Sequence, residues 1–150
     1  MKKSLLAAAV IVALGAVGGA ALAQVKPETL VKQRQSAMTL IGKYFGPLGG
    51  MAQGKVPYDA KIVQRNAEYL HTLAQMPWDG FDPSTKGEKS KTKAEAFTDT
   101  AKFRAAADTL EAETAKLGAA ARAKNEAGVR AAFGGVAKAC GSCHDAYRDN

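Results

Sequence analysis

Apolar residues recur along the chain at steps of three and four, the period of an α-helix, in four separate stretches. The first stretch covers about 27–45, the second about 57–75, the third 92–117 and the fourth 129–147. The fourth is the most regular, and its steps of four and three link Val129, Phe133, Val136, Cys140, Cys143 and Tyr147. Four amphipathic helices with mostly short links predict an all-α fold, an antiparallel up-down four-helix bundle.

Local signals mark where these helices begin and end. Gly46-Pro47 is expected to end the first helix. Thr92-Lys93-Ala94-Glu95 fits the capping-box pattern at the start of the third helix. The stretch 118–125 is expected to hold the next turn, with Asn125 capping the fourth helix. The loop 77–91 is long for a link between neighbouring helices, so we expect it to cross an end of the bundle.

The N-terminus has the pattern of an export signal. Two lysines precede an apolar run over 5–17, and Ala21-Leu22-Ala23 gives the small-x-small pattern that signal peptidase cleaves. The alternative is an uncleaved membrane anchor, although the run is short for a span of about 20 residues. We expect a cleaved signal peptide over 1–23, a mature single domain over 24–150 in the periplasm, and no membrane span after signal removal.

Charge and cysteine content narrow the function classes. The net charge is +7, with 21 Lys and Arg against 14 Asp and Glu, and it becomes +5 without the two lysines of the signal. The basic residues are scattered and not interleaved with aromatics, so no nucleic acid partner is expected. The mild excess suits an acidic redox partner protein. Both cysteines lie within the last eleven residues, so no disulfide framework is predicted.

The two cysteines belong to the motif Cys140-Gly141-Ser142-Cys143-His144, which is typical of c-type haem attachment. Helical residues three and four apart share a face, so the two thiols can add to the two vinyl groups of a single porphyrin, one thiol to each. His144 is then placed to ligate the iron as the metal-binding residue. The motif therefore predicts one haem c per chain, covalently attached through Cys140 and Cys143.

Other uses of the motif fit less well. A thioredoxin-like redox pair normally lies near a βαβ pattern, which an all-helical chain lacks. A zinc site would need a fourth ligand, and the only other histidine is His71. His71 lies off the centre of its apolar stripe, and we expect it to be partly exposed.

Further segments carry a family pattern that spans nearly all of the mature chain. In chain order they are Arg34-Gln35-x-x-Met38, Gly46-Pro47-Leu48, Gly54-Lys55-x-Pro57-Tyr58-Asp59-Ala60, Pro77-Trp78-x-x-Phe81, and Ala131-Ala132-Phe133-Gly134 leading to Cys140-x-x-Cys143-His144-Asp145-x-Tyr147-Arg148. This order resembles the cytochromes c′, class II c-type cytochromes related to the low-spin cytochrome c-556 branch. The chain departs from the resemblance at 88–97, where the family often carries Pro-Glu-Ile-Trp.

The resemblance implies roles for further side chains. Arg34 lies on a buried stripe, and the matching arginine of the family approaches a haem propionate; the alternative is a side chain that snorkels to the surface. The remaining expected haem contacts are Trp78, Phe81, Phe133, Tyr147 and Arg148. Trp78 and Phe81 would close the distal pocket, although both also suit an ordinary aromatic core.

The expected function depends on the iron position opposite His144, where Met38 is the main candidate. If Met38 only fills space, the iron is five-coordinate and binds a small gas such as nitric oxide or carbon monoxide, which is the reading we favour. If Met38 is the sixth ligand, the protein is a low-spin electron-transfer cytochrome. No distal His and Arg pair is present to cleave an O–O bond, so we expect no enzyme. The resemblance also implies a homodimer through the first two helices.

Overall fold

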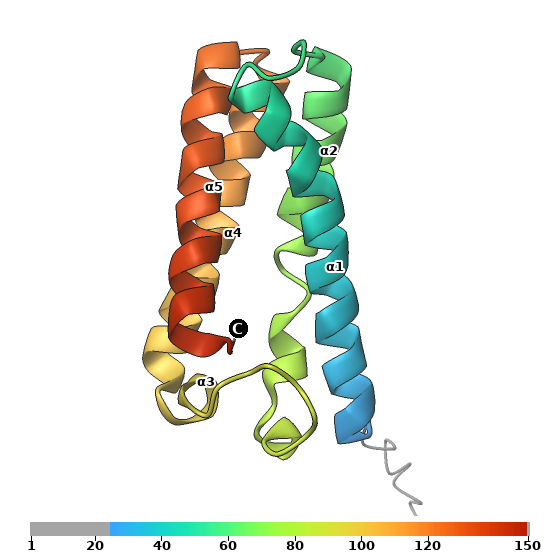
Figure 1. The fold of residues 1–150 in the computed structure, drawn as a ribbon, viewed down its shortest axis with the longest axis vertical. Coiled ribbons are helices and arrows are strands. Elements are labelled where there is room, and N and C mark those ends of the chain that lie inside the picture. Colours follow the sequence, from blue (N-terminus) through green and yellow to red (C-terminus); the bar gives the residue numbers. More distant parts are fainter. Residues whose placement is uncertain (1–24, 150) are drawn as a thin grey trace, which may run out of the picture.

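The computed structural model describes residues 25–149, so the predicted signal peptide lies outside the described residues. Four long helices form the bundle: α1 (Pro27–Ala52), α2 (Ala60–Leu73), α4 (Thr100–Arg122) and α5 (Glu126–Tyr147). Helix α4 lies against α2 and α5, and α1 lies against α2. Successive long helices run in opposite directions, as Figure 1 shows, which confirms the all-α, antiparallel four-helix bundle. No helix within residues 25–149 is long and apolar enough to cross a membrane.

The segment between α2 and α4 crosses one end of the bundle, as its length predicted (Figure 1). It holds two 3₁₀ turns, η1 (Trp78–Phe81) and η2 (Pro83–Thr85), and the four-residue helix α3 (Glu95–Thr98). Near its far end, Thr92 pairs with Arg148 in an isolated antiparallel bridge. The segment thus joins α2 to α4 and also contacts the end of α5.

The predicted end of the first helix at Gly46-Pro47 is wrong, because α1 continues through Pro47 to Ala52. Proline inside a helix removes one hydrogen bond and crowds the preceding turn. The compensation is burial: Leu48 and Met51 keep the helical spacing beyond Ile41, and only 1% of Leu48 is exposed. Apolar burial of this extent is worth about 1.5–3 kcal/mol per side chain, enough to offset the proline.

Arg130 of α5 caps the carboxyl end of α1. Its Nη1 donates to the carbonyl oxygens of Met51 and Ala52 at 2.7 and 2.6 Å. The last four carbonyls of a helix lack partners within the helix, so the bond to Ala52 satisfies a free carbonyl, and the bond to Met51 adds to the one from the Gly54 amide at 3.2 Å. The contact ties the helix beyond Pro47 to α5, which also carries the haem motif.

Replacing Arg130 with methionine is expected to lower the free energy of unfolding by about 1.5–3 kcal/mol, because hydrogen bonds from a charged group are lost at a helix end. Urea denaturation measures the change. Arg104→Met is the matched control, since Arg104 forms only exposed ion pairs with Asp108 and Glu111, and such pairs contribute at most about 1 kcal/mol. Equal losses in the two variants would contradict the capping role of Arg130.

The third predicted helix differs from the structure at both ends. The capping box at Thr92 does not form: Ala94 precedes α3 and makes no side-chain cap, while the Thr92 hydroxyl accepts a hydrogen bond from Arg34. At the other end α4 passes through Gly118 to Arg122. Leu117 and Ala121 are both buried there, so packing against the core holds the helix together past the glycine.

The fourth predicted helix is confirmed as α5. Asn125 caps it as expected, with its side-chain oxygen accepting from the Gly128 amide at 2.9 Å. Val129 and Val136 of its apolar seam are buried in the core of the bundle. The seam therefore directs the motif at the end of the same stripe toward the interior.

Candidate functional site

A cavity of about 700 Å³ opens in the half of the bundle that contains α3 and the end of α5. Cofactor and ligand sites typically fall between about 300 and 1,000 Å³. Four parts of the chain line it: α1, α4, α5 and the segment between α2 and α4. The lining residues on which the site depends are Arg34, Met38, Ile41, Phe45, Trp78, Phe81, Ser90, Lys91, Thr92, Phe103, Leu110, Cys140, Cys143, His144, Tyr147 and Arg148.

The motif forms the α5 wall, where Cys140, Cys143 and His144 all line the cavity. The two cysteines are free thiols, each half-buried. Burial raises the pKa of the Cys140 thiol, and burial together with the neighbouring Cys140 raises the pKa of Cys143. Neither thiol is activated as a thiolate in the folded chain, so a redox role for the pair has no support here.

His144 presents its imidazole to the same cavity. It is exposed by surface area, but the protein packed around its inner side lowers its pKa, and the charge of Arg148 lowers it further. Asp145 acts in the opposite direction, to a smaller extent. A neutral imidazole is the form that ligates a metal, so this environment keeps His144 ready for iron.

The α1 wall is largely apolar and contributes Met38, Ile41 and Phe45. Met38 is half-buried and packs against the bundle core. The predicted distal residue and the predicted iron ligand His144 therefore line one cavity from two different helices.

Aromatic rings close another side of the cavity. Trp78, Phe81 and Tyr147, three of the predicted haem contacts, line it together with Phe103. The Phe103 ring lies 4.7 Å from that of Phe81 and 5.1 Å from that of Tyr147, between centroids. Phe103 lies on the buried stripe of α4, and an apolar stripe does not distinguish a core ring from a cavity wall. The indole Nε1 of Trp78 is buried without a hydrogen-bond partner among residues 25–149.

Phe133 is not among the residues that line the cavity, and its predicted contact with the haem ring stays a prediction. It stacks on Phe45, with ring centroids 4.5 Å apart and planes 7° from parallel. The physical reason is its distance along α5: Phe133 lies about two turns before Cys140, where α1 and α5 are in contact. Since Phe45 does line the cavity, Phe133 supports the wall from behind.

Arg34 is buried, with 2% of its surface exposed, and also lines the cavity. Its guanidinium lies 4.6 Å from the centre of the Phe81 ring. No carboxylate within residues 25–149 forms an ion pair with it. Burial lowers the pKa of Arg34, and a buried cation without an anion is costly unless every N–H finds a partner.

Those partners come from the segment between α2 and α4. Nη1 donates to the Gly80 carbonyl and to Thr85 Oγ1 at 2.9 Å. Nη2 donates to Ser90 Oγ at 3.0 Å and Thr92 Oγ1 at 3.1 Å. A guanidinium has five N–H groups, so only the one on Nε is left for a cofactor carboxylate. The approach of Arg34 to a haem propionate stays a prediction, and in this arrangement Nε is the donor left free for it.

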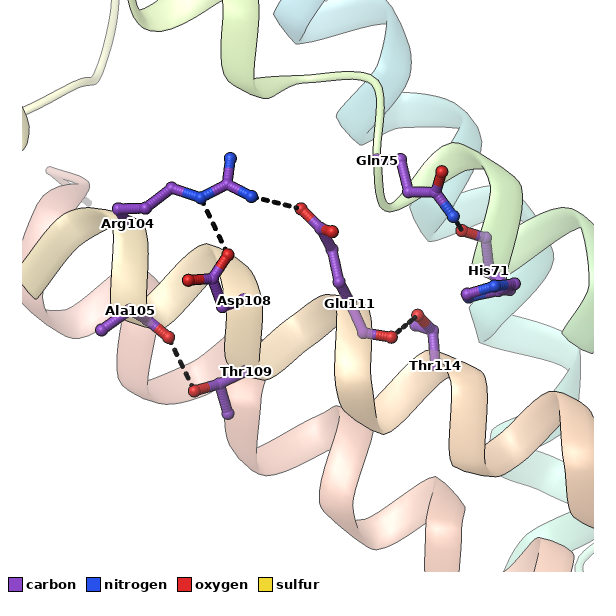
Figure 2. Close-up of polar contacts among 8 residues, drawn as sticks. All are labelled: His71, Gln75, Arg104, Ala105, Asp108, Thr109, Glu111 and Thr114. Atoms are coloured by element: carbon purple, nitrogen blue, oxygen red, sulfur yellow. Dashed lines mark hydrogen bonds and ion pairs between the residues drawn. The ribbon is translucent and has the colours of Figure 1, made fainter.

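His71 is placed outside the cavity, which agrees with its expected minor role. Figure 2 shows it on α2, which packs against α4, the helix that carries Glu111 and Thr114. Its carbonyl accepts from Gln75 Nε2 at 3.3 Å, and its Nδ1 is buried without a partner among the described residues. No cluster of three or more His, Cys, Asp or Glu side chains within residues 25–149 could hold a metal ion by itself.

The residues of the cavity fit haem c. Both thiols and the imidazole converge on one space, apolar and aromatic side chains surround it, and a buried arginine supplies positive charge for a group that carries carboxylates. Cys140 and Cys143 would hold the group, and His144 would ligate its iron. The aromatic and aliphatic walls would exclude water from it.

Comparison with known proteins agrees with this fit. A family model described as Cytochrome C' matches residues 29–148. Cytochrome c' from Alcaligenes xylosoxydans xylosoxydans is 42% identical over 123 residues, covering 82% of this chain and 95% of that protein. The crystal structure of cytochrome c' from Rubrivivax gelatinosus has a TM-score of 0.80 and 40% identity, covering 83% of this chain and 98% of that one. A nitric oxide complex of a cytochrome c prime mutant from Alcaligenes xylosoxidans has a TM-score of 0.79 and 41% identity, covering 85% of this chain and 98% of that one. The chain belongs to the cytochrome c′ family and binds haem c.

Proposed function

We propose that this protein is a periplasmic gas-binding cytochrome in which His144 ligates the haem iron and the opposite axial position stays free for a small ligand such as nitric oxide. The observation that carries the proposal is the α1 wall. Between Arg34 and Phe45 it presents no His, Cys, Tyr or carboxylate to the cavity. An apolar distal wall leaves iron five-coordinate, and ferrous five-coordinate haem iron supplies the chemistry of binding a diatomic gas.

The nitric oxide complex of the Alcaligenes relative supports this choice of ligand, because that protein has a comparable fold at 41% identity. The walls of the cavity in this chain also favour a small uncharged gas. Ile41, Phe45 and Leu110 keep the space apolar, which suits an uncharged gas better than a charged ligand.

We also propose a binding role and not an enzymatic one. Cleavage of an O–O bond needs distal proton donors, and His144 is the only histidine that lines the cavity within residues 25–149. Arg34 has both terminal nitrogens engaged by the segment 80–92, so its guanidinium fork is not free to act on a bound ligand.

A second candidate function is electron transfer by low-spin iron, with Met38 as sixth ligand. The observation in its favour is that the Met38 thioether lines the same cavity as His144. Met and His together are the axial pair of many electron-carrying haem proteins. The alternative to ligation is that Met38 only fills space over the cofactor, as flexible methionines do in cores.

Electron paramagnetic resonance of the ferric protein separates the two functions. We expect a high-spin signal that Met38→Ala leaves unchanged, because no protein ligand occupies the distal position. Met76→Ala is the matched control, since Met76 is 54% exposed and lies outside the cavity. A low-spin signal that becomes high-spin in Met38→Ala, but not in Met76→Ala, would contradict gas binding at five-coordinate iron and support electron transfer with Met38 as a ligand.

The proposed location and assembly rest on separate features. The signal pattern over 1–23 supports export to the periplasm and a mature domain over 24–150; the N-terminal sequence of the exported protein tests it. A homodimer through α1 and α2 is supported by two exposed apolar side chains, Leu40 and Tyr69, which are 40% and 46% exposed. Analytical ultracentrifugation tests the dimer, and a monomer at all concentrations would exclude it.

A further inference from the structure

The residues Ser90–Lys93, hereafter the strap, connect two walls of the cavity that are far apart in sequence. On one side the strap is held by α1. Arg34 Nη2 donates to Ser90 Oγ and Thr92 Oγ1 at 3.0 and 3.1 Å. Because Arg34 is almost fully buried while Ser90 and Thr92 are half-buried, these bonds are partly shielded from water, which makes them stronger than exposed equivalents.

On the other side the strap is paired with the end of α5. Thr92 lies opposite Arg148 in an antiparallel bridge. The Lys93 amide donates to the Tyr147 carbonyl at 2.9 Å, and the Asp149 amide donates to the Lys91 carbonyl at 2.8 Å. These two bonds flank the Thr92–Arg148 pair, as in a short antiparallel ladder.

The strap also satisfies the carboxyl end of α5. The final carbonyls of a helix have no partners within it, and those of Asp145 and Tyr147 receive bonds from Lys93, through Nζ at 2.8 Å and the amide at 2.9 Å. His144 belongs to this last turn, since its carbonyl accepts from the Arg148 amide at 3.0 Å. Without the strap, the turn that carries the iron ligand would be a free helix end, and helix ends fray.

We infer that Thr92 is a positioning residue for the haem site: its hydroxyl, fixed by Arg34, holds the strap that caps α5 and thereby sets the orientation of His144 relative to the α1 wall. Arg34 belongs to the same chain of contacts, because its guanidinium holds the strap at the edge of the cavity. The inference about His144 rests on its proposed ligation of iron, whereas the connection from Arg34 to the end of α5 does not.

The test is the variant Thr92→Val, which keeps the β-branched shape but removes the hydroxyl. Hydrogen exchange of the Lys93 and Asp149 amides, measured in the haem-loaded protein, is expected to become about tenfold faster, the effect of losing one hydrogen bond to a charged group. Thr98→Val is the matched control, because the Thr98 hydroxyl is exposed and donates only to Ala94 of its own turn. Unchanged exchange at Lys93 and Asp149 in Thr92→Val would overturn the proposed role of Thr92 in holding the strap.

A double-variant comparison isolates the Arg34 contact. In an Arg34→Lys background, which keeps the charge but removes the two-pronged donor, adding Thr92→Val is expected to change exchange at Asp149 less than twofold. An undiminished tenfold effect would show that Thr92 acts without Arg34 and would overturn the connection. Acceleration spread evenly over all of α5, as for a general loss of stability, would overturn it as well.

The positioning role has its own readout. In Thr92→Val, and not in Thr98→Val, the hyperfine-shifted proton signals of the ligating histidine and the midpoint potential of the iron are expected to shift. Faster exchange with an unchanged histidine signature would reduce the strap to a structural contact and overturn the positioning role. If the unmodified protein showed no His144 signature, the proposed ligation itself would fail, an outcome distinct from failure of the strap.

Discussion

Replacing Cys140 and Cys143 together with alanine is expected to leave haem that acid-acetone removes completely from the protein. The reason is chemical: each thiol adds across one vinyl group, its hydrogen passing to the vinyl carbon, and the resulting thioether bonds survive denaturation. Ligation by His144 alone is a coordinate bond that acid breaks when it protonates the imidazole. The measurement is the haem absorbance of the protein pellet against the acetone phase.

Two further variants make this result specific. Ser142→Ala alters the motif between the cysteines but keeps both thiols, and its haem should stay with the protein. Each single cysteine variant keeps one thioether and should also retain haem. A double variant recovered with no haem at all agrees with thiol attachment, whereas extraction-resistant haem in that variant would contradict it.

The sequence predicted the existence and type of all four long helices, because each carries an apolar stripe that the bundle buries. It mislocated helix ends where a strong local signal is outweighed by packing. Pro47 should stop α1, but burial of Leu48 and Met51 carries the helix beyond it. Gly118 should loosen α4, but the buried neighbours Leu117 and Ala121 hold it. Asn125 caps α5 as predicted, because its side-chain oxygen needs only the Gly128 amide three residues away.

The candidate site likewise has features that local sequence predicts and features that depend on the tertiary structure. The motif at 140–144 could be read from the sequence because its chemistry depends on spacing within one helix. The role of Arg34 could not, because its partners Thr85, Ser90 and Thr92 lie 51 to 58 residues away. A buried arginine in a helix suggests an anion, and the sequence carries no sign that neutral oxygens of a distant loop also bind it. Thr92 fits a helix cap equally well by pattern, and only the fold shows its hydroxyl engaged elsewhere.

These contacts place Gly80 in close contact with α1. Its carbonyl accepts from Arg34, and it lies inside η1, between the two cavity aromatics Trp78 and Phe81. A Cβ built at Gly80 would lie 2.6 Å from the Cβ of Arg34 and 2.8 Å from the Leu30 carbonyl oxygen. The second neighbour is backbone within α1, so it cannot move aside as a flexible side chain would.

Gly80→Ala is therefore expected to destabilise the folded protein by about 2–3 kcal/mol, the upper range for overpacking in a tightly packed site. The methyl group pushes η1 away from α1, which weakens the Arg34 contacts and displaces Trp78 and Phe81 from the cavity wall. Chemical denaturation gives the loss of stability, and the haem absorption spectrum should change with it, because the wall around the cofactor is altered. Gly134→Ala gives the opposite expectation in the same protein: a Cβ at Gly134 meets no atom within 4 Å, so the substitution should stabilise α5 by about 0.5–1 kcal/mol through helix propensity and leave the haem spectrum unchanged. Equal stabilities for the two alanine variants would show that the loop yields at Gly80, and that Arg34 does not hold η1 rigidly against α1.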